Sequence, residues 1–493
     1  MLQKSDPPLV PPPEPQFPKK QPKSSDPCKN PLHFLPIYIS VHPRTWLLLL
    51  ILFLQLLLLL TIRSLPISTL GFLSPTPNPN PNPNPNPKPN PNPPPAASCD
   101  SGRVFVYDLP SVFNKDLSDD CEGLNPWNSR CDALSNDGFG LPAADLDGIV
   151  PENLMPAWFS TDQFTAEIIY HNRILSHPCR TLDPDSATAF YVPFYGGLAV
   201  GKFLWSKYNS EDRDRHCTML LNWLQEQEFW KRSNGWDHFM MLGRITWDFR
   251  RSNDGDWGGS FLYMPGMRNV TRLLIERNPW DEFDIGVPYP TGFHPRTNSD
   301  ILDWQQYVLN RKRSTRFCFA GATRSGFKDD FRSFLLQQCR DAEGTCRSVD
   351  CSGSRCSNSS MATMQLFLDS DFCLQPRGDS FTRRSIFDCM IAGSIPVFFW
   401  RRSAYMQYPW HLPVEPESYS VFIDRRDVKN GTSIRAVLEG LGEERVRMMR
   451  EKIAEYLPKF VYVAPKEGLE GSKDAFDVAL EGVLGRFREQ RGS

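Results

Sequence analysis

Residues 372–399 read FCLQPRGDSFTRRSIFDCMIAGSIPVFF, and this stretch decides the fold class. The apolar run FCLQ predicts a buried strand, PRGDS predicts a turn, and TRRSIFDCMIA has the spacing of a helix. Gly393 then precedes a second apolar run, IPVFFW, at a place where helices commonly end on a left-handed residue. Strand, helix and strand in this order indicate a parallel α/β unit.

Short apolar runs alternate with amphipathic runs on both sides of this unit. The apolar runs are continuous, which is typical of parallel strands covered on both faces by helices. Ser160 and Gln163 form a capping box that predicts the start of a helix over residues 164–175. A polar stretch from Arg296 to Thr315 separates two sets of strands. The strands predicted outside the opening stretch are RVFVYDLP, ATAFYVPFY, HFMMLG and DIGVPYP before residue 296, and RFCFAG and YSVFID after residue 314.

These patterns predict two Rossmann-like domains that face one cleft, over residues 100–300 and 301–465, followed by a C-terminal helix and tail over 466–493. The length of 493 residues exceeds what one core usually serves. The 55 basic and 57 acidic side chains leave a net charge of -2. We therefore expect no nucleic-acid partner, because the chain as a whole offers no electrostatic attraction to a polyanion.

The first hundred residues predict a membrane anchor and a spacer. Residues 46–60 read WLLLLILFLQLLLLL, and about 20 residues cross a bilayer core. The cations gather before this run, so the positive-inside bias predicts a cytosolic tail (1–43), a signal anchor (44–63) and a lumenal remainder. A cleaved signal peptide is the alternative, but its charged leader is normally short. The Pro-Asn repeat that follows predicts an extended polyproline II stem over residues 64–99.

Cysteines and glycosylation sequons agree with a lumenal location. Of the 13 cysteines, only Cys28 precedes the anchor, and the even number beyond it suits disulfides in a secretory compartment. Three sequons, at Asn269, Asn358 and Asn430, lie on the same side of the anchor.

The loop after the strand FCLQ predicts an anion site at the carboxyl end of the sheet, where ligands of such folds bind. Ser380 or Thr382 can cap the following helix, whose first amide groups then face the cleft. Arg377, Arg383 and Arg384 add planar forks that match linked phosphates. A second strand end, RFCFAGATR, brings Arg324 to the same edge. The alternative is that these arginines pair with local carboxylates such as Asp379.

Asp388 lies further along the same helix and can accept hydrogen bonds from sugar hydroxyls. A diphosphate together with sugar hydroxyls describes a nucleotide-sugar. The predicted donor-binding residues are therefore Arg324, Arg377, Asp379, Ser380, Thr382, Arg383, Arg384 and Asp388.

The first half is expected to receive the acceptor. Asp108 follows the strand RVFVY, Arg244, Trp247 and Asp248 follow HFMMLG, and His294 follows DIGVPYPTGF. Aromatic faces stack on sugar rings, and carboxylates or imidazole remove protons. We therefore predict Arg244 and Trp247 as acceptor-binding and Asp108, Asp248 and His294 as candidate bases. Each also has a structural alternative: Asp108 as a turn cap, Asp248 as a partner of Arg244, and His294 as a turn residue before proline.

Three DxD triplets, at residues 183–185, 254–256 and 369–371, are interpreted as turns. The last of them stands at the beginning of a strand, which is the wrong end of the sheet for a ligand. We expect no metal and no cofactor, with arginines supplying the counter-charge for phosphate.

Five stretches together resemble a known family. VFVYDLPSVFN, YVPFYGGL, WDHFMMLGRITWDFRR, FCFAGATR and the opening stretch are similar to the exostosin-like inverting glycosyltransferases of family 47, and more narrowly to their plant xyloglucan galactosyltransferase branch. The likeness covers roughly residues 100 to 465. Asp388 stands where the family usually has Glu, and animal exostosins carry an arginine where this chain has Ser385. The form GDSFTRRS is typical of the plant branch.

The resemblance implies a fold of the glycosyltransferase B type, no required metal and a type II Golgi membrane protein. It also implies UDP-galactose as donor and a xylosyl side chain of xyloglucan as acceptor, joined by a β linkage. Two alternatives remain: transfer of arabinose, galacturonic acid or glucuronic acid, and a non-catalytic glycan-binding subunit of a complex with other Golgi glycosyltransferases.

Overall fold

The computed structural model describes residues 99–205, 208–324, 330–352 and 361–492, together with positions 55 and 356. The predicted tail, the anchor apart from position 55, the stem before residue 99, and Asn358 lie outside these residues. Within the described ranges, no helix has both the length and the apolar character that a membrane crossing requires. The chain divides into two compact units, residues 1–89 and 90–493, and both sheets belong to the second.

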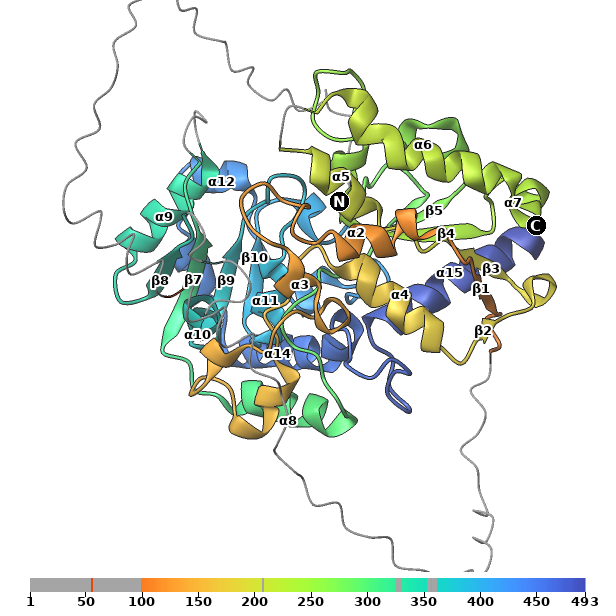
Figure 1. The fold of residues 1–493 in the computed structure, drawn as a ribbon. Helices are drawn as coiled ribbons and strands as arrows, with labels where there is room; N and C mark the ends of the chain where they lie inside the picture. Colours follow the sequence, from red (N-terminus) through yellow and green to blue (C-terminus); the bar gives the residue numbers. More distant parts are fainter. Residues whose placement is uncertain are drawn as a thin grey trace, which may run out of the picture. The chain divides into compact units, whose positions relative to one another are not determined.

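Six parallel strands form the first sheet, in the order β2-β1-β3-β4-β5-β6 (Figure 1). Of these, β2 and β5 were not among the predicted strands. The bounds are β1 Val104–Val106, β2 Arg180–Thr181, β3 Ala189–Tyr191, β4 His238–Ile245, β5 Thr271–Glu276 and β6 Asp284–Gly286.

Five parallel strands form the second sheet, in the order β11-β10-β9-β7-β8. The edge strand β8 was not predicted. The bounds are β7 Thr315–Gly321, β8 Cys346–Asp350, β9 Ser370–Gln375, β10 Ile395–Phe398 and β11 Val421–Phe422. The chain is therefore an α/β protein with two parallel, Rossmann-like sheets.

Helices connect the strands and cover the sheets. Their bounds are α2 Lys115–Asp119, α3 Cys131–Leu134, α4 Ala166–Ser176, α5 Gly196–Phe203, α6 Ser210–Glu226, α7 Glu228–Ser233, α8 Asn298–Asn310, α9 Phe331–Asp341, α10 Met361–Leu368, α11 Ser385–Ile391, α12 Arg425–Lys429, α13 Ile434–Glu439, α14 Glu443–Tyr456 and α15 Ala475–Gly492. A short 3-10 helix, η6, covers Thr246–Phe249.

Side chains alternate across the first sheet as a strand buried on both faces requires. Met240 and Leu242 pack with residues of α5 and α6, whereas Phe239 and Met241 belong to the apolar cluster that includes α15. That cluster continues without a break into the second sheet. The two halves therefore share one core.

Two local predictions are corrected. The stretch from Arg296 to Thr315 contains the helix α8, whose Trp304 is fully buried and donates its indole N–H to the carbonyl of Ile391 at 2.9 Å. The helix α4 begins at Ala166 with Thr165 at its N-cap position, so Ser160 and Gln163 form no capping box. The carboxylate of Asp162 accepts the amide of Phe164 there instead.

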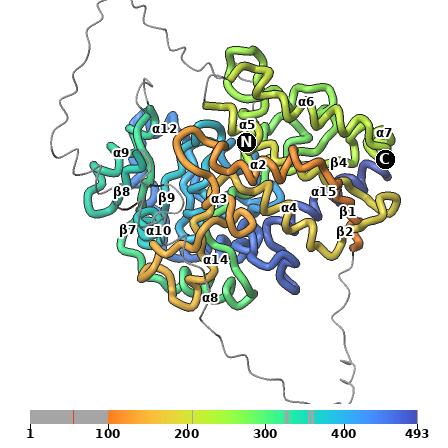
Figure 2. The backbone as a smooth tube through the Cα atoms, in the orientation of Figure 1, coloured from red at the N-terminus to blue at the C-terminus, as the bar shows by residue number. Residues whose placement is uncertain are grey.

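The C-terminal helix α15 returns to the first half of the chain. It packs against β3, which is far from it in sequence, and Figure 2 shows the C-terminus at its end near α7. The ring of Phe487 lies 6.4 Å from that of Phe239, and Arg491 donates to the carbonyl of Thr188 at 3.0 Å. Gly393 has a φ of +67°, which confirms the predicted left-handed residue after α11.

Candidate active site

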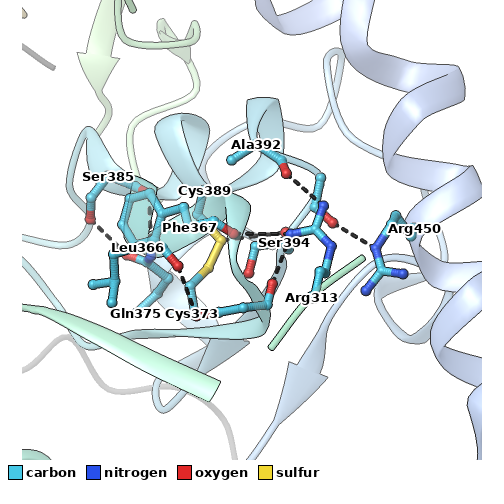
Figure 3. The surroundings of a disulfide bond; sticks show 12 residues. Arg313, Leu366, Phe367, Cys373, Gln375, Ser385, Cys389, Ala392, Ser394 and Arg450 are labelled. Atoms are coloured by element: carbon cyan, nitrogen blue, oxygen red, sulfur yellow. Dashed lines mark hydrogen bonds between the residues drawn. A yellow bond between two sulfur atoms is a disulfide. The ribbon is translucent and has the colours of Figure 1, made fainter. Parts of the chain in front are cut away.

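Residues 376–384 form the loop between β9 and α11, which we call the arginine loop. A disulfide and a pair of hydrogen bonds link the strand to the helix on either side of this loop. Cys373 in the strand and Cys389 in the helix are buried and form a disulfide (Figure 3). At the ends of the loop, Ser385 Oγ donates to Gln375 Oε1 at 2.8 Å, and Gln375 Nε2 donates to the Ser385 carbonyl at 3.2 Å. The loop therefore presents its side chains from a fixed base.

The arginine loop meets the loop after β7 at one edge of the second sheet. Arg324 donates to the carbonyl of Gly378 at 2.5 Å and to the carboxylate of Asp379 at 2.6 Å. Arg383 donates to the carbonyl of Ala320, near the end of β7, at 2.9 Å. The structure thus places Arg324 beside the loop that carries Arg377 and Arg383.

Among the described residues at this edge, arginines outnumber carboxylates. Burial, followed by the neighbouring cations of Arg332 and Arg324, lowers the pKa of Arg383 to about 9. Burial and then Arg324 also lower the pKa of Arg377. Among the described residues, Nη1 of Arg383 is buried and has no hydrogen-bond partner. A cluster of partly buried and exposed arginines fits an anionic ligand.

The predicted helix cap is wrong. The helix α11 begins at Ser385, and neither Ser380 nor Thr382 caps it. The amides of Phe381 and Thr382 instead donate to Oε2 of Glu276, at 3.0 and 3.3 Å. These two N–H groups are therefore already satisfied by a carboxylate.

Glu276 is a functional candidate that the sequence analysis missed. It ends β5 in the first half, is 2% exposed, and accepts a hydrogen bond from Tyr289 Oη at 2.6 Å. Burial raises its pKa to about 7, although the hydrogen bonds act in the opposite direction. The available signal was the run TRLLIE, in which a carboxylate directly follows a buried strand.

Phe381 brings the acceptor side to the arginine loop. Its ring stacks with those of Trp247 and Trp400, with centroids 5.7 and 5.6 Å apart, and lies 5.8 Å from Trp280. The guanidinium of Arg377 lies 5.8 Å from the centroid of Trp400. Trp247, predicted from the acceptor half, therefore contacts the loop predicted to bind the donor.

Arg384 points away from Arg383 and into the boundary between the halves. It donates to the carbonyl of Thr161 at 2.6 Å and forms an ion pair with Asp388 at 3.3 Å. Burial raises the pKa of Asp388. The adjacent arginines Arg383 and Arg384 thus face two different surroundings.

His294 is fully buried in the same boundary. Its Nδ1 donates to the carbonyl of Tyr462 at 2.7 Å, its Nε2 lies 2.8 Å from Thr161 Oγ1, and its ring stacks on Phe139 at 3.8 Å. Burial lowers its pKa to about 3. These contacts make the imidazole a weak base and a part of the core.

Asp248 and Arg244 are paired with each other. Arg244 Nε donates to Oδ2 of Asp248 at 2.6 Å, and the indole N–H of Trp257 donates to Oδ1 at 2.7 Å. The guanidinium of Arg244 also lies 4.2 Å from the centroid of Phe164. Asp108 differs, because it is exposed after β1 and its carboxylate has no hydrogen bond or ion pair to another described residue.

The carboxylates of the triplet 369–371 are held by arginines. Asp369 pairs with Arg311 at 2.9 Å, and Asp371 pairs with Arg450 at 2.7 Å and with Arg316 at 3.2 Å. They stand at the start of β9, at the opposite end of the strand from the arginine loop.

The described sequons differ in exposure. Asn430 is exposed after α12, whereas Asn269 is partly buried and donates to the carbonyl of Asn234 at 3.1 Å.

A cavity of about 630 Å³ lies elsewhere. Asp237 and Trp236, two of its lining residues, directly precede β4, whereas Trp247 follows the end of that strand. The cavity and the arginine loop are therefore at opposite ends of the strands, and the two arginines that line the cavity, Arg232 and Arg491, lie beside the carboxylate of Asp237.

Comparisons with known proteins place the chain in a family. The model of the Exostosin GT47 domain matches residues 98–438. Xyloglucan galactosyltransferase XLT2 of Arabidopsis thaliana is 65% identical over 393 residues, which cover 80% of this chain and 76% of that protein. Xyloglucan galactosyltransferase MUR3 and Xyloglucan-specific galacturonosyltransferase 1, from the same plant, are 40% and 42% identical.

The matched regions cover 80% and 78% of this chain, but only 63% and 57% of the last two relatives. Among solved structures, the glycosyltransferase WaaG is similar over 61% of this chain and 93% of that chain, with 11% identity and a TM-score of 0.28. From the family model and the relative that is 65% identical, the chain belongs to the exostosin GT47 family of glycosyltransferases.

Proposed function

We propose that the chain is an inverting glycosyltransferase that transfers galactose from UDP-galactose to xylosyl side chains of xyloglucan, in β-1,2 linkage, during synthesis of cell-wall hemicellulose. The observation that carries this proposal is the surplus of cations where Arg324, Arg377 and Arg383 meet. The identity of 65% to a relative named xyloglucan galactosyltransferase supports the choice of sugar and acceptor.

In the proposed reaction, a hydroxyl oxygen of the xylosyl unit attacks the anomeric carbon of galactose from the face opposite UDP. The carbon–oxygen bond to UDP breaks, and the diphosphate leaves with the electron pair. Arg324, Arg377 and Arg383 stabilise the negative charge that develops on the diphosphate, in the place of a metal ion. Asp388 accepts hydrogen bonds from hydroxyls of the donor.

A carboxylate of the first sheet takes the proton from the attacking hydroxyl. We assign this role to Asp248, because β4 neighbours β5 and the adjacent residue Trp247 contacts the arginine loop. Asp108 is further away by strand order, and burial lowers the pKa of His294 to about 3, which makes it a weak base. Loss of transfer in Asp108→Asn, with activity retained in Asp248→Asn, would reverse the assignment.

We further propose the glycosyltransferase B type, with domains over residues 100–300 and 301–465, and a type II Golgi membrane protein with a lumenal catalytic part. The charge asymmetry and apolar run before residue 64 support the topology. Five disulfides among the described residues support an oxidising compartment.

The test is the double variant Arg324→Ala with Arg383→Ala in the full-length chain. We expect galactose transfer to fall at least about 100-fold, since two phosphate-facing cations are removed. The matched control is Arg426→Ala, an exposed arginine paired only locally with Asp424. Normal transfer by the double variant would contradict the proposed donor site.

The donor is tested by comparing UDP-galactose with UDP-galacturonic acid, UDP-glucuronic acid and UDP-arabinose on one xyloglucan acceptor. We expect galactose to be transferred fastest. Release of no UDP with any donor would favour the non-catalytic alternative.

A further inference from the structure

Three tryptophans from separate loops form an exposed aromatic cluster on the first half. Trp127, Trp205 and Trp257 are 64%, 44% and 38% exposed. The centroid of Trp205 lies 5.4 Å from that of Trp127 and 5.0 Å from that of Trp257. Grouped exposed aromatic rings of this kind mark a binding surface, because isolated apolar side chains are the usual case on a soluble protein.

The loop that carries Trp127 is held in place at both ends. The Cys121–Cys131 disulfide closes it. The adjacent Asp120 pairs at 2.6 Å with Lys202 of α5, the helix that directly precedes the segment containing Trp205. Trp127 and Trp205 are therefore presented from connected, fixed elements.

Trp257 is held just as firmly. Its indole N–H donates to Asp248 at 2.7 Å, and the next residue, Gly258, has a φ of +88°. A Cβ at Gly258 would lie only 2.6 Å from the carbonyl oxygen of Asp248, so the turn needs glycine. The ring is thus fixed before any ligand binds, which reduces the entropy lost on binding.

The cluster is continuous with the candidate active site. Trp257 bonds to Asp248, and the preceding residue, Trp247, stacks on Phe381 of the arginine loop. A ligand lying over the three tryptophans therefore extends toward the place where the donor diphosphate is proposed to bind.

Resting on the proposed function, we propose that Trp127, Trp205 and Trp257 bind the neutral glucan backbone of the acceptor polysaccharide, beside the side chain that receives galactose. Sugar rings offer C–H faces to indoles and hydroxyls to polar neighbours. Lys202 and Asp120 pair with each other and so add no net charge beside Trp127 and Trp205.

The experiment uses the full-length chain with Trp127→Ala and Trp205→Ala, and with Trp236→Ala as matched control, an exposed tryptophan at the opposite end of β4. We expect each cluster variant to raise KM for polymeric xyloglucan roughly fivefold, the loss of one aromatic contact. KM for UDP-galactose should not change, and Trp236→Ala should change neither constant. An unchanged polymer KM, or an equal effect of Trp236→Ala, would overturn the proposal.

A second measurement does not depend on transfer. Migration in gels that contain xyloglucan or unbranched hydroxyethyl cellulose should be retarded for the wild-type chain and less so for Trp127→Ala. Equal retardation of both would overturn the proposal, as would a change in sedimentation that shows the cluster to join two copies. If the wild-type chain galactosylates no xyloglucan, the proposed function fails, while retardation still tests the cluster.

Discussion

The arginines of the first sheet differ from those of the arginine loop. The side chains of Arg250 and Arg272 are 6% and 2% exposed, and they share the carboxylates of Asp281 and Asp284, with Arg250–Asp284 at 2.8 Å and Arg272–Asp281 at 2.6 Å. Burial opposes the charge of Arg250, but Asp284 and Asp281 together raise its pKa. Burial first, and neighbouring arginines after it, lower the pKa values of Arg377 and Arg383.

This difference separates two uses of the same side chain. Where carboxylates match the arginines, the charges serve the fold and need nothing further. Where arginines outnumber carboxylates among the described residues, an anionic ligand would balance the remaining charge, and such sites are functional candidates.

The largest expected effect is on stability, at the arginines that are paired with Asp281 and Asp284. Asp284→Ala leaves Arg250 and Arg272 short of a fully buried partner, so the free energy of unfolding should fall by about 3–5 kcal/mol. Urea unfolding measures it. The control is Asp379→Ala, whose exposed carboxylate pairs with Arg324 and should matter by less than about 1 kcal/mol. Equal losses of unfolding free energy in Asp284→Ala and Asp379→Ala would contradict the proposed difference between the two groups of arginines.

The next effect concerns Glu276, which joins the two regions. Its pKa of about 7 in the folded chain exceeds its ordinary value of 4.5, so the folded state holds a proton that the unfolded state has lost. Wild-type stability should therefore fall as pH rises from 4.5 to 7, by up to about 3 kcal/mol from this group.

In Glu276→Gln this contribution is absent, so the stability of the variant relative to wild type should rise across the same pH range. Thermal unfolding at several pH values measures it, with Asp108→Asn as the exposed control. A constant difference between Glu276→Gln and wild type from pH 4.5 to 7 would contradict the assignment.

The smallest expected effect is on donor binding and concerns Arg383 of the arginine loop. Arg383→Lys keeps the charge but loses the planar fork, so KM for the sugar nucleotide should rise about tenfold with little loss of stability. Arg250→Lys should show the reverse, with lower stability and an unchanged KM. Initial rates and urea unfolding on the same preparations distinguish the two. The comparison fails if both variants lose donor affinity alike.

Much of the fold could be predicted because strands buried on both faces appear as continuous apolar runs. β4, β7 and β10 were found in this way. β8 could not be found in this way, because its sequence CRSVD is polar and it is an edge strand that pairs with β7. β5 and α8 could have been found, since TRLLIE is apolar and Ile301, Trp304 and Val308 follow a helical period.

The positions of the site residues were predictable only where they follow from the order of the strands along the chain. Arg324 and Arg383 follow neighbouring parallel strands, so their meeting at one edge follows from the sheet. Two other features depend on contacts between the halves, over more than 100 residues of sequence. Arg384 donates to the carbonyl of Thr161, and Glu276 accepts hydrogen bonds from two amides of the arginine loop. No local pattern encodes such contacts.

The return of α15 also determines when the first half can be completed during synthesis. Phe476 packs on Tyr170, and Arg173 pairs with Asp474, so the first half takes residues from the last twenty of the chain. A nascent chain that has emerged only to residue 465 lacks these contacts. The earliest sheet can therefore be fully covered only after residues 474–492 have been synthesised, and a stop codon shortly before residue 475 should harm residues made hundreds of codons earlier.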